Sequence, residues 1–151
     1  MYEEKLKQMG IELPQAPAPL AAYIPAILAG DLVYTSGQIP LVGGELKFKG
    51  KVGAEISEAQ GYEAAKVCAI NCLSAIKGVI GSLDKIARVV KVTGFVNSAP
   101  GFSAQPKVVN GASEFLGEVF GEAGKHARSA VGVSELPIDS AVEVELVVKL
   151  K

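Results

Sequence analysis

The residues best suited to chemistry lie near the C-terminal end, in the stretch HARSAVGVSELPIDSAVEVELVV from His126 to Val148. A single arginine, Arg128, interrupts an otherwise apolar pattern there. Burying a guanidinium without a partner is costly, so a negatively charged group should face it, either from the protein or from a ligand. Which of the two faces Arg128 decides whether this stretch is a site.

Alternation along the two expected strands assigns faces to these side chains. Arg128, Ala130 and Gly132 share one face of the first strand, and Glu143 and Glu145 share the polar face of the second. We interpret the two strands as a hairpin whose apolar rows face the same side: Ser129, Val131 and Val133, then Val142, Val144, Leu146 and Val148. This arrangement puts Arg128 on the face of the two glutamates.

The small side chains of Ala130 and Gly132 are expected to leave open volume beside Arg128. A long cation, two carboxylates and a floor of small residues form a credible pocket for a small anion. The alternative is an ordinary structural ion pair on a solvated sheet face. The pattern alone leaves both interpretations open.

The rest of the chain supplies the elements that position these residues. A short N-terminal helix ends at Gly10 and is followed by the Pro/Ala-rich segment LPQAPAPLAAYIP; residues 1–18 form this helix and lead-in. Residues 26–48 predict a meander of short strands whose first hairpin turn is Gly30-Asp31. A capping box, Ser57 with Gln60, opens a helix over 58–81.

Within that helix, a buried stripe is expected from spacing: Tyr62, Ala65, Ala69, Cys72, Ile76 and Val79. Residues 86–97 are rich in β-branched side chains and predict a strand, and a second helix should lie within 103–124, bounded by Pro106 and Gly121. The order is strands, helix, strand, helix, strands. It predicts a single α+β domain over residues 1–151, with helices packed on a sheet.

Composition excludes several classes of function. The chain has 151 residues, 49% of them hydrophobic, and its 15 Lys+Arg against 16 Asp+Glu give a formal net charge of −1. The basic residues are scattered, so no nucleic-acid partner is expected. No secretory signal is recognised, and the apolar runs are shorter than the ~20 residues of a membrane span. We therefore expect a cytoplasmic protein without a membrane partner.

Cys68 and Cys72 stand four residues apart on one helix face. With His126 as the only histidine, they cannot complete a four-ligand zinc site, and we interpret them as buried small hydrophobes. Neither a metal nor a cofactor is expected.

The motifs TSGQIP (35–40) and ARSAVGVSELP (127–137), with the trailing VEVE (142–145), resemble the Rid family. These reactive intermediate deaminases are also called YjgF-like proteins or L-PSP endoribonucleases. The resemblance extends from about Pro19 to the C-terminus. It implies a chorismate-mutase-like α+β fold with two helices on one face of the sheet, assembled as a homotrimer around an inner barrel, with ligand sites between subunits.

The resemblance also implies roles for individual residues. Arg128 would hold the carboxylate of a 2-aminoacrylate-type enamine or its imine, and Glu143 would orient the water that hydrolyses it. The substrate-binding positions are Tyr23, from a neighbouring subunit, Ser36 and Gly37 in the ligand loop, Asn110 at the second helix, and Ala130 through its backbone. Ala130 replaces the family's usual cysteine, and His126 replaces its usual proline.

Three functions follow from these residues. The first is an enamine or imine deaminase, and the second is a noncatalytic trimer that binds small carboxylate metabolites. Ribonuclease activity is the least favoured, because the chain is slightly acidic and His126 is its only imidazole. We interpret His126 as a structural histidine on the same side as Arg128.

Overall fold

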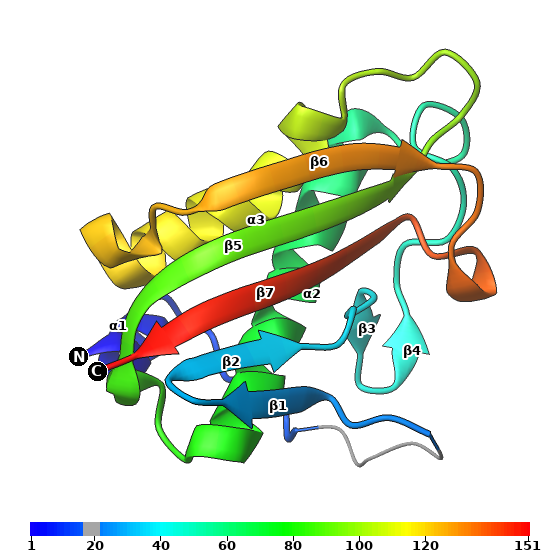
Figure 1. Cartoon of the computed structure of the whole chain (residues 1–151). Coiled ribbons are helices and arrows are strands. Elements are labelled where there is room, and N and C mark those ends of the chain that lie inside the picture. The colour runs from blue at the N-terminus through cyan, green and yellow to red at the C-terminus, as the bar shows by residue number, and fades with distance from the viewer. Residues whose placement is uncertain (17–21) are drawn as a thin grey trace.

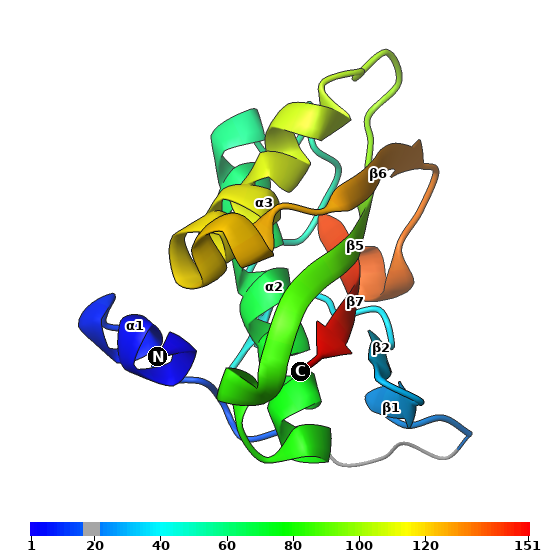
Figure 2. The ribbon, with the colours of Figure 1, turned by 60° about the vertical axis from the view of Figure 1, so that its left-hand side comes forward.

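The computed structural model describes residues 1–16 and 22–151. A five-stranded mixed sheet forms one layer, and two helices, α2 (Glu58–Ile80) and α3 (Gln105–Phe120), cover one of its faces (Figures 1 and 2). This arrangement confirms the predicted α+β fold with two helices on one face of the sheet.

The strand order across the sheet is β1 (Ala26–Ala29), β2 (Leu32–Thr35), β7 (Val142–Leu150), β5 (Ile86–Asn97) and β6 (Ala127–Val133). The expected C-terminal hairpin is therefore wrong, because β5 lies between β6 and β7. The chain crosses from β5 to β6 through α3, and a helical crossover joins parallel strands. Strand β7 then pairs antiparallel with the other edge of β5.

The N-terminal half contains the predicted meander. β1 and β2 form a hairpin around Gly30 and Asp31, as the sequence predicts. β3 (Leu41–Val42) and β4 (Glu45–Leu46) form a separate two-stranded sheet. Their turn, Gly43-Gly44, has φ of 60° and 82°, values that favour glycine in two-residue hairpins.

Helix α2 begins with the predicted capping box: Ser57 accepts from the Gln60 backbone, and the Gln60 side chain accepts from the Ser57 N–H. Cys68 and Cys72 are completely buried, which confirms their place in the core. Their thiols donate to the carbonyl oxygens of Val142 and Val144, at 3.5 and 3.3 Å. The predicted stripe is wrong at one end, where Val79 is 41% exposed.

Helix α1 (Tyr2–Gln8) is anchored beside the start of the β5 segment. Leu6 is only 2% exposed, and the Tyr2 N–H donates to Asp84 at 2.7 Å, next to the short 3-10 helix η1 (Leu83–Lys85). The Lys151 ammonium lies 5.9 Å from the Tyr2 ring centroid, so the two chain ends meet here (Figure 1). None of the helices described is long and apolar enough to span a membrane.

The two faces of the sheet differ in what covers them. Val92, Val144 and Leu146 face the helices and are at most 1% exposed. The opposite face, which we call the open face, has no helix over it (Figure 2). Ile27 and Tyr34 on this face are 53% and 44% exposed. The open face of the single chain thus exposes large apolar side chains.

The contact between α2 and α3 depends on Gly111. A Cβ built there would lie 1.9 Å from the Tyr62 carbonyl oxygen, whereas one built at Gly117 meets nothing within 4 Å. We expect Gly111→Ala to lower the free energy of unfolding by about 2 kcal/mol or more, because the helices must separate. Gly117→Ala in the same helix should raise it by up to about 1 kcal/mol.

Urea unfolding of the two variants beside the unchanged protein measures both values. Equal stability of Gly111→Ala and the unchanged protein would contradict the close approach of these helices.

Candidate functional site

Arg128 projects from β6, the strand at one edge of the sheet, toward α3. Its partner in the register is Val92, so it lies on the face that the helices cover. Nη1 of the guanidinium donates to Asn110 Oδ1 at 2.8 Å and to Ser113 Oγ at 3.2 Å. Asn110 and Ser113 stand three residues apart on α3 and therefore share one face of that helix.

No carboxylate neutralises Arg128. Among the described residues, none of the ion pairs within 4.0 Å includes this arginine. The remaining residues, 17–21, are Pro-Ala-Pro-Leu-Ala and contain no acid. A partly buried cation thus has only neutral oxygens as partners, and its charge is free to attract an anion.

His126 lies two residues before Arg128 and joins the same network. Its Nδ1 is 2.6 Å from the Gly124 carbonyl oxygen, and its Nε2 is 2.9 Å from Ser113 Oγ. Since a carbonyl can only accept, Nδ1 carries the proton, and Nε2 of the neutral ring accepts from the Ser113 hydroxyl. We call Asn110, Ser113, His126 and Arg128 the arginine cluster.

Burial lowers the pKa of His126 below its ordinary value of 6.5. The hydrogen bond to Gly124 raises this pKa in part, and the charge of Arg128 lowers it further. The imidazole is therefore neutral at pH 7. The sequence placed His126 on the side of Arg128, as found, but did not identify Ser113. The available signal was the three-residue spacing from Asn110, which predicts a shared helix face.

Glu143 lies on the opposite face of the sheet from Arg128. In the register, Glu143 and Val131 both pair with Phe95, whereas Arg128 pairs with Val92 of the buried row. The prediction that Arg128 shares a face with Glu143 and Glu145 is therefore wrong. Alternation gives each strand two faces, and the faces of two strands can be matched directly only where the strands are paired. Strands β6 and β7 are not paired, because β5 lies between them.

Glu143 packs directly against the loop that follows β2. A Cβ built at Gly37 would lie 2.5 Å from Glu143 Oε2, so a larger residue at position 37 would displace this carboxylate from its observed place. Burial raises the pKa of Glu143 above its ordinary value, and the charge of Glu145 raises it further. We call Ser36, Gly37 and Glu143 the glutamate cluster.

Tyr23 lies in the segment before β1 and is 56% exposed. Ser36 holds the two residues that follow Tyr23 in place. Its hydroxyl donates to the Ile24 carbonyl at 2.6 Å, and its N–H donates to the Pro25 carbonyl at 2.7 Å. The chain thus brings Tyr23 near the glutamate cluster, whereas Asn110 belongs to the arginine cluster.

The expected open volume beside Arg128 is not found at Gly132. A Cβ there would lie 2.7 Å from Gln105 Nε2 and 2.8 Å from Ser98 Oγ, so polar side chains already fill the space. Ala130 packs against the core opposite Gly94. The small residues of β6 thus permit close packing near the start of α3, which the alternation pattern does not reveal.

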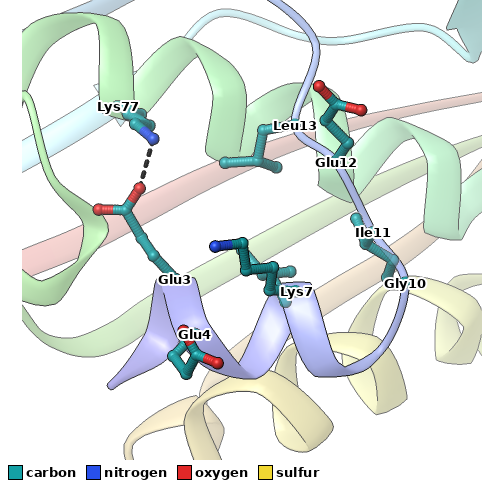
Figure 3. A pocket seen from close by; sticks show the side chains of 9 residues that line it. Glu3, Glu4, Lys7, Gly10, Ile11, Glu12, Leu13 and Lys77 are labelled. Carbon is teal, nitrogen blue, oxygen red and sulfur yellow. Dashed lines mark hydrogen bonds and ion pairs between the residues drawn. The ribbon is translucent and has the colours of Figure 1, made fainter.

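A separate pocket of about 700 Å³ lies between α1, the segment after it and α2. Glu3 pairs there with Lys77, and Lys7 and Glu12 also line the hollow (Figure 3). The Ser82 hydroxyl donates to the second Glu3 oxygen at 2.7 Å. The Glu3 contacts hold α1 against the body, and none of the predicted site residues lines this pocket.

The profile of the family described as "YjgF/chorismate_mutase-like, putative endoribonuclease" matches residues 3–150. Protein TCP17 of Trypanosoma cruzi is 44% identical over 148 residues, covering 96% of this chain and 91% of its own length. The chain belongs to the Rid (YjgF-like) family. The resemblance of its two motifs to that family is confirmed.

Two further relatives support the placement in the Rid family. A 2-iminobutanoate/2-iminopropanoate deaminase of Dermatophagoides farinae is 33% identical over 143 residues, covering 93% of this chain and 95% of its own length. The crystal structure of Atu1372 from Agrobacterium tumefaciens, a protein of unknown function, has a TM-score of 0.93 at 42% identity. The alignment covers 99% of this chain and 92% of that one.

The lowered pKa of His126 predicts a loss of stability in mild acid. In the unfolded chain the His126 imidazole binds a proton near pH 6.5, whereas in the folded chain it binds one only at lower pH. Acid therefore favours the unfolded chain, and the free energy of unfolding should fall as the pH drops from about 6.5 through the folded-state pKa of His126. Urea unfolding at about pH 7.5 and about pH 5.5 measures this loss.

His126→Gln is the control, since it removes the only histidine and should abolish the loss in this window. An NMR titration midpoint of His126 above 6.5 would contradict the burial argument.

Proposed function

We propose that this protein hydrolyses small enamines or imines that carry a carboxylate, at sites formed between the subunits of a homotrimer. The observation that carries the proposal is the Arg128 guanidinium, whose only partners among the described residues are the neutral oxygens of Asn110 and Ser113. A half-buried cation held in place, yet not neutralised, is suited to bind a small anion.

The contacts of Arg128 favour a planar anion. Within residues 1–16 and 22–151, Nη1 alone makes hydrogen bonds, and both go to α3. Nη2 and Nε are therefore available as a fork, which matches the two oxygens of a carboxylate. Asn110 and Ser113 hold the guanidinium plane, so binding requires little reordering of the side chain.

Glu143 supplies the base for the chemical step. A water oxygen forms a bond to the carbon of the protonated C=N group while its proton passes to the Glu143 carboxylate and the π electrons pass to the nitrogen. Glu143 then returns that proton to the nitrogen, and the C–N bond breaks as the new hydroxyl loses its proton to Glu143 and becomes the carbonyl, so the nitrogen leaves as ammonia. The product is a 2-oxo acid. The raised pKa of Glu143 makes its carboxylate a stronger base than an exposed glutamate.

A site that uses both Arg128 and Glu143 requires two chains. The two side chains lie on opposite faces of one sheet, with β5 between their strands, so they cannot meet within a subunit. The open face offers an apolar surface for association, on which Ile27, Tyr34 and Val131 are each at least 44% exposed. Tyr23 would complete the cleft from the neighbouring subunit.

The name of the Dermatophagoides farinae relative supports the choice of substrate class, since that protein is a 2-iminobutanoate/2-iminopropanoate deaminase. A noncatalytic binder of small carboxylates is the second candidate. It is favoured by the separation of the glutamate cluster from the arginine cluster within one chain. Ammonia release from imines generated in situ distinguishes the two functions, because a binder gives no acceleration over buffer.

Arg128→Lys should weaken the binding of 2-oxobutyrate by about tenfold or more, because an ammonium keeps the charge but loses the fork. Titration calorimetry measures the affinity. Arg88→Lys is the matched control and should bind normally, since in the described residues Arg88 donates to the backbone carbonyls of Val89 and Lys125 and to no side chain of the arginine cluster. Unchanged affinity of Arg128→Lys, or no binding by the unchanged protein, would refute the anion site.

Glu143→Gln should leave carboxylate binding intact and slow imine hydrolysis by ~10²–10⁴, because an amide cannot take the proton from water. The assay follows the disappearance of 2-iminopropionate with and without protein. Glu145→Gln, on the same face two residues later, is the control and should remain active. Full activity of Glu143→Gln would assign the base to another residue.

Mixing the two inactive variants tests the assembly directly. When Arg128→Lys and Glu143→Gln subunits are mixed in equal amounts and co-assembled, about a quarter of the sites should be active. These are the sites in which a Glu143→Gln chain supplies Arg128 and the neighbouring Arg128→Lys chain supplies Glu143. Light scattering on the same sample should give three times the 15.6 kDa chain mass. A monomer, or a mixture as inactive as its parts, would rule out the shared site.

A further inference from the structure

In the proposed imine hydrolysis the Ser113 hydroxyl only positions Arg128, yet its surroundings are those of an activated nucleophile. It donates to His126 Nε2 at 2.9 Å, and the Gly124 carbonyl, 2.6 Å from Nδ1, fixes the tautomer in which Nε2 can accept. A third group that orients the base completes the usual arrangement for nucleophilic catalysis. Here a backbone carbonyl supplies that orientation.

We propose that Ser113 and His126 form a second reactive centre, which hydrolyses short-chain acyl esters through an acyl-serine intermediate. Ser113 Oγ forms a bond to the acyl carbon and its proton passes to His126 Nε2. The C–O bond to the leaving alkoxide then breaks, and the alkoxide takes that proton from Nε2. Water repeats the sequence on the acyl-serine, giving a carboxylic acid and restoring the hydroxyl.

The surroundings of the hydroxyl suit this chemistry. Arg128 Nη1 donates to Ser113 Oγ at 3.2 Å, so a fixed cation stabilises the negative charge that develops on Oγ as its proton leaves. Lys125 and Glu114 are the other charged groups at the mouth, and Lys125 is paired with Glu122. Neutral His126 is in the state that can accept the proton.

The space beside the hydroxyl limits the size of the acyl group. Ser113 and His126 both line a surface pocket of about 290 Å³, together with Gly117 and Gly124. Gly117 follows Ser113 by about one helical turn, and a Cβ there would meet nothing within 4 Å, which leaves open volume next to Oγ. A volume of about 290 Å³ holds the whole of a short ester, such as an acetate or a propionate ester.

The dyad lies wholly within one chain, because Ser113 belongs to α3 and His126 to the segment that enters β6. The centre shares Arg128 with the imine site but needs neither Glu143 nor a second subunit. It can therefore fail or succeed independently of the proposed deaminase activity.

A fluorophosphonate probe tests the proposal, because an activated serine displaces its fluoride and forms a stable Oγ–P bond. We expect one label per chain, located at Ser113 by peptide mass mapping, with slow hydrolysis of 4-nitrophenyl acetate. His126→Gln should reduce the labelling rate at least about 100-fold, as loss of a general base does. Ser113→Ala should abolish labelling.

Two controls separate reactivity from folding. Ser129→Ala changes an exposed hydroxyl on β6, one residue from Arg128, and should label normally. Cooperative urea unfolding of Ser113→Ala and of His126→Gln would show that both variants are folded. An unlabelled native protein, a label on another residue, or equal rates for the native protein and His126→Gln would each overturn the assignment.

Discussion

The register of β5 determines the faces on which Arg128 and Glu143 lie. This strand pairs with β6 on one side and β7 on the other, and its residues 91–96 have a partner in both neighbours. Val92 aligns Arg128 with the buried row, and Phe95 aligns Glu143 with the open face. A slip of one residue between β5 and β7 would turn the Glu143 carboxylate toward the helices, and a slip between β5 and β6 would turn Arg128 away from them.

Helix α3 supplies the side chains that contact Arg128 on the covered face of the sheet. Close approach of α3 to the sheet is possible because β5 carries Gly94, where a Cβ would lie 2.5 Å from Val109. The next residue of the helix, Asn110, then reaches the guanidinium of Arg128. Neutral acceptors there satisfy part of the donor capacity of the arginine while leaving its charge uncompensated. A glutamate at either position would neutralise the cation that an anionic ligand requires.

Local signals in the sequence were sufficient for most of the elements. The capping box placed the start of α2, and the β-branched run over 86–97 coincides with β5. The order of the strands was not available, because alternation gives each strand two faces without saying which strand is its neighbour. Treating β6 and β7 as a hairpin therefore assigned Arg128 to the face of Glu143.

The candidate site was predictable only where a motif carried it. Arg128 and Glu143 stood out in the residue pattern, and the resemblance to the Rid family added their roles and the position of Asn110. Ser113 was missed, since a serine within a helix has no distinctive pattern until the strand beneath it is known. His126 was assigned to the correct side of β6, but its partners come from α3 and from the turn after it.

The reactivity of the two buried thiols of α2 depends on the separation of this helix from the sheet. Cys68 and Cys72 have no exposed surface, and burial raises the pKa of Cys68 and brings that of Cys72 to about 12. Thiolate is the reactive form, so an alkylating reagent meets neither the required species nor a path to it in the native state. Alkylation therefore requires that α2 separate from β7, and the alkylation rate measures how often the helix layer and the sheet separate.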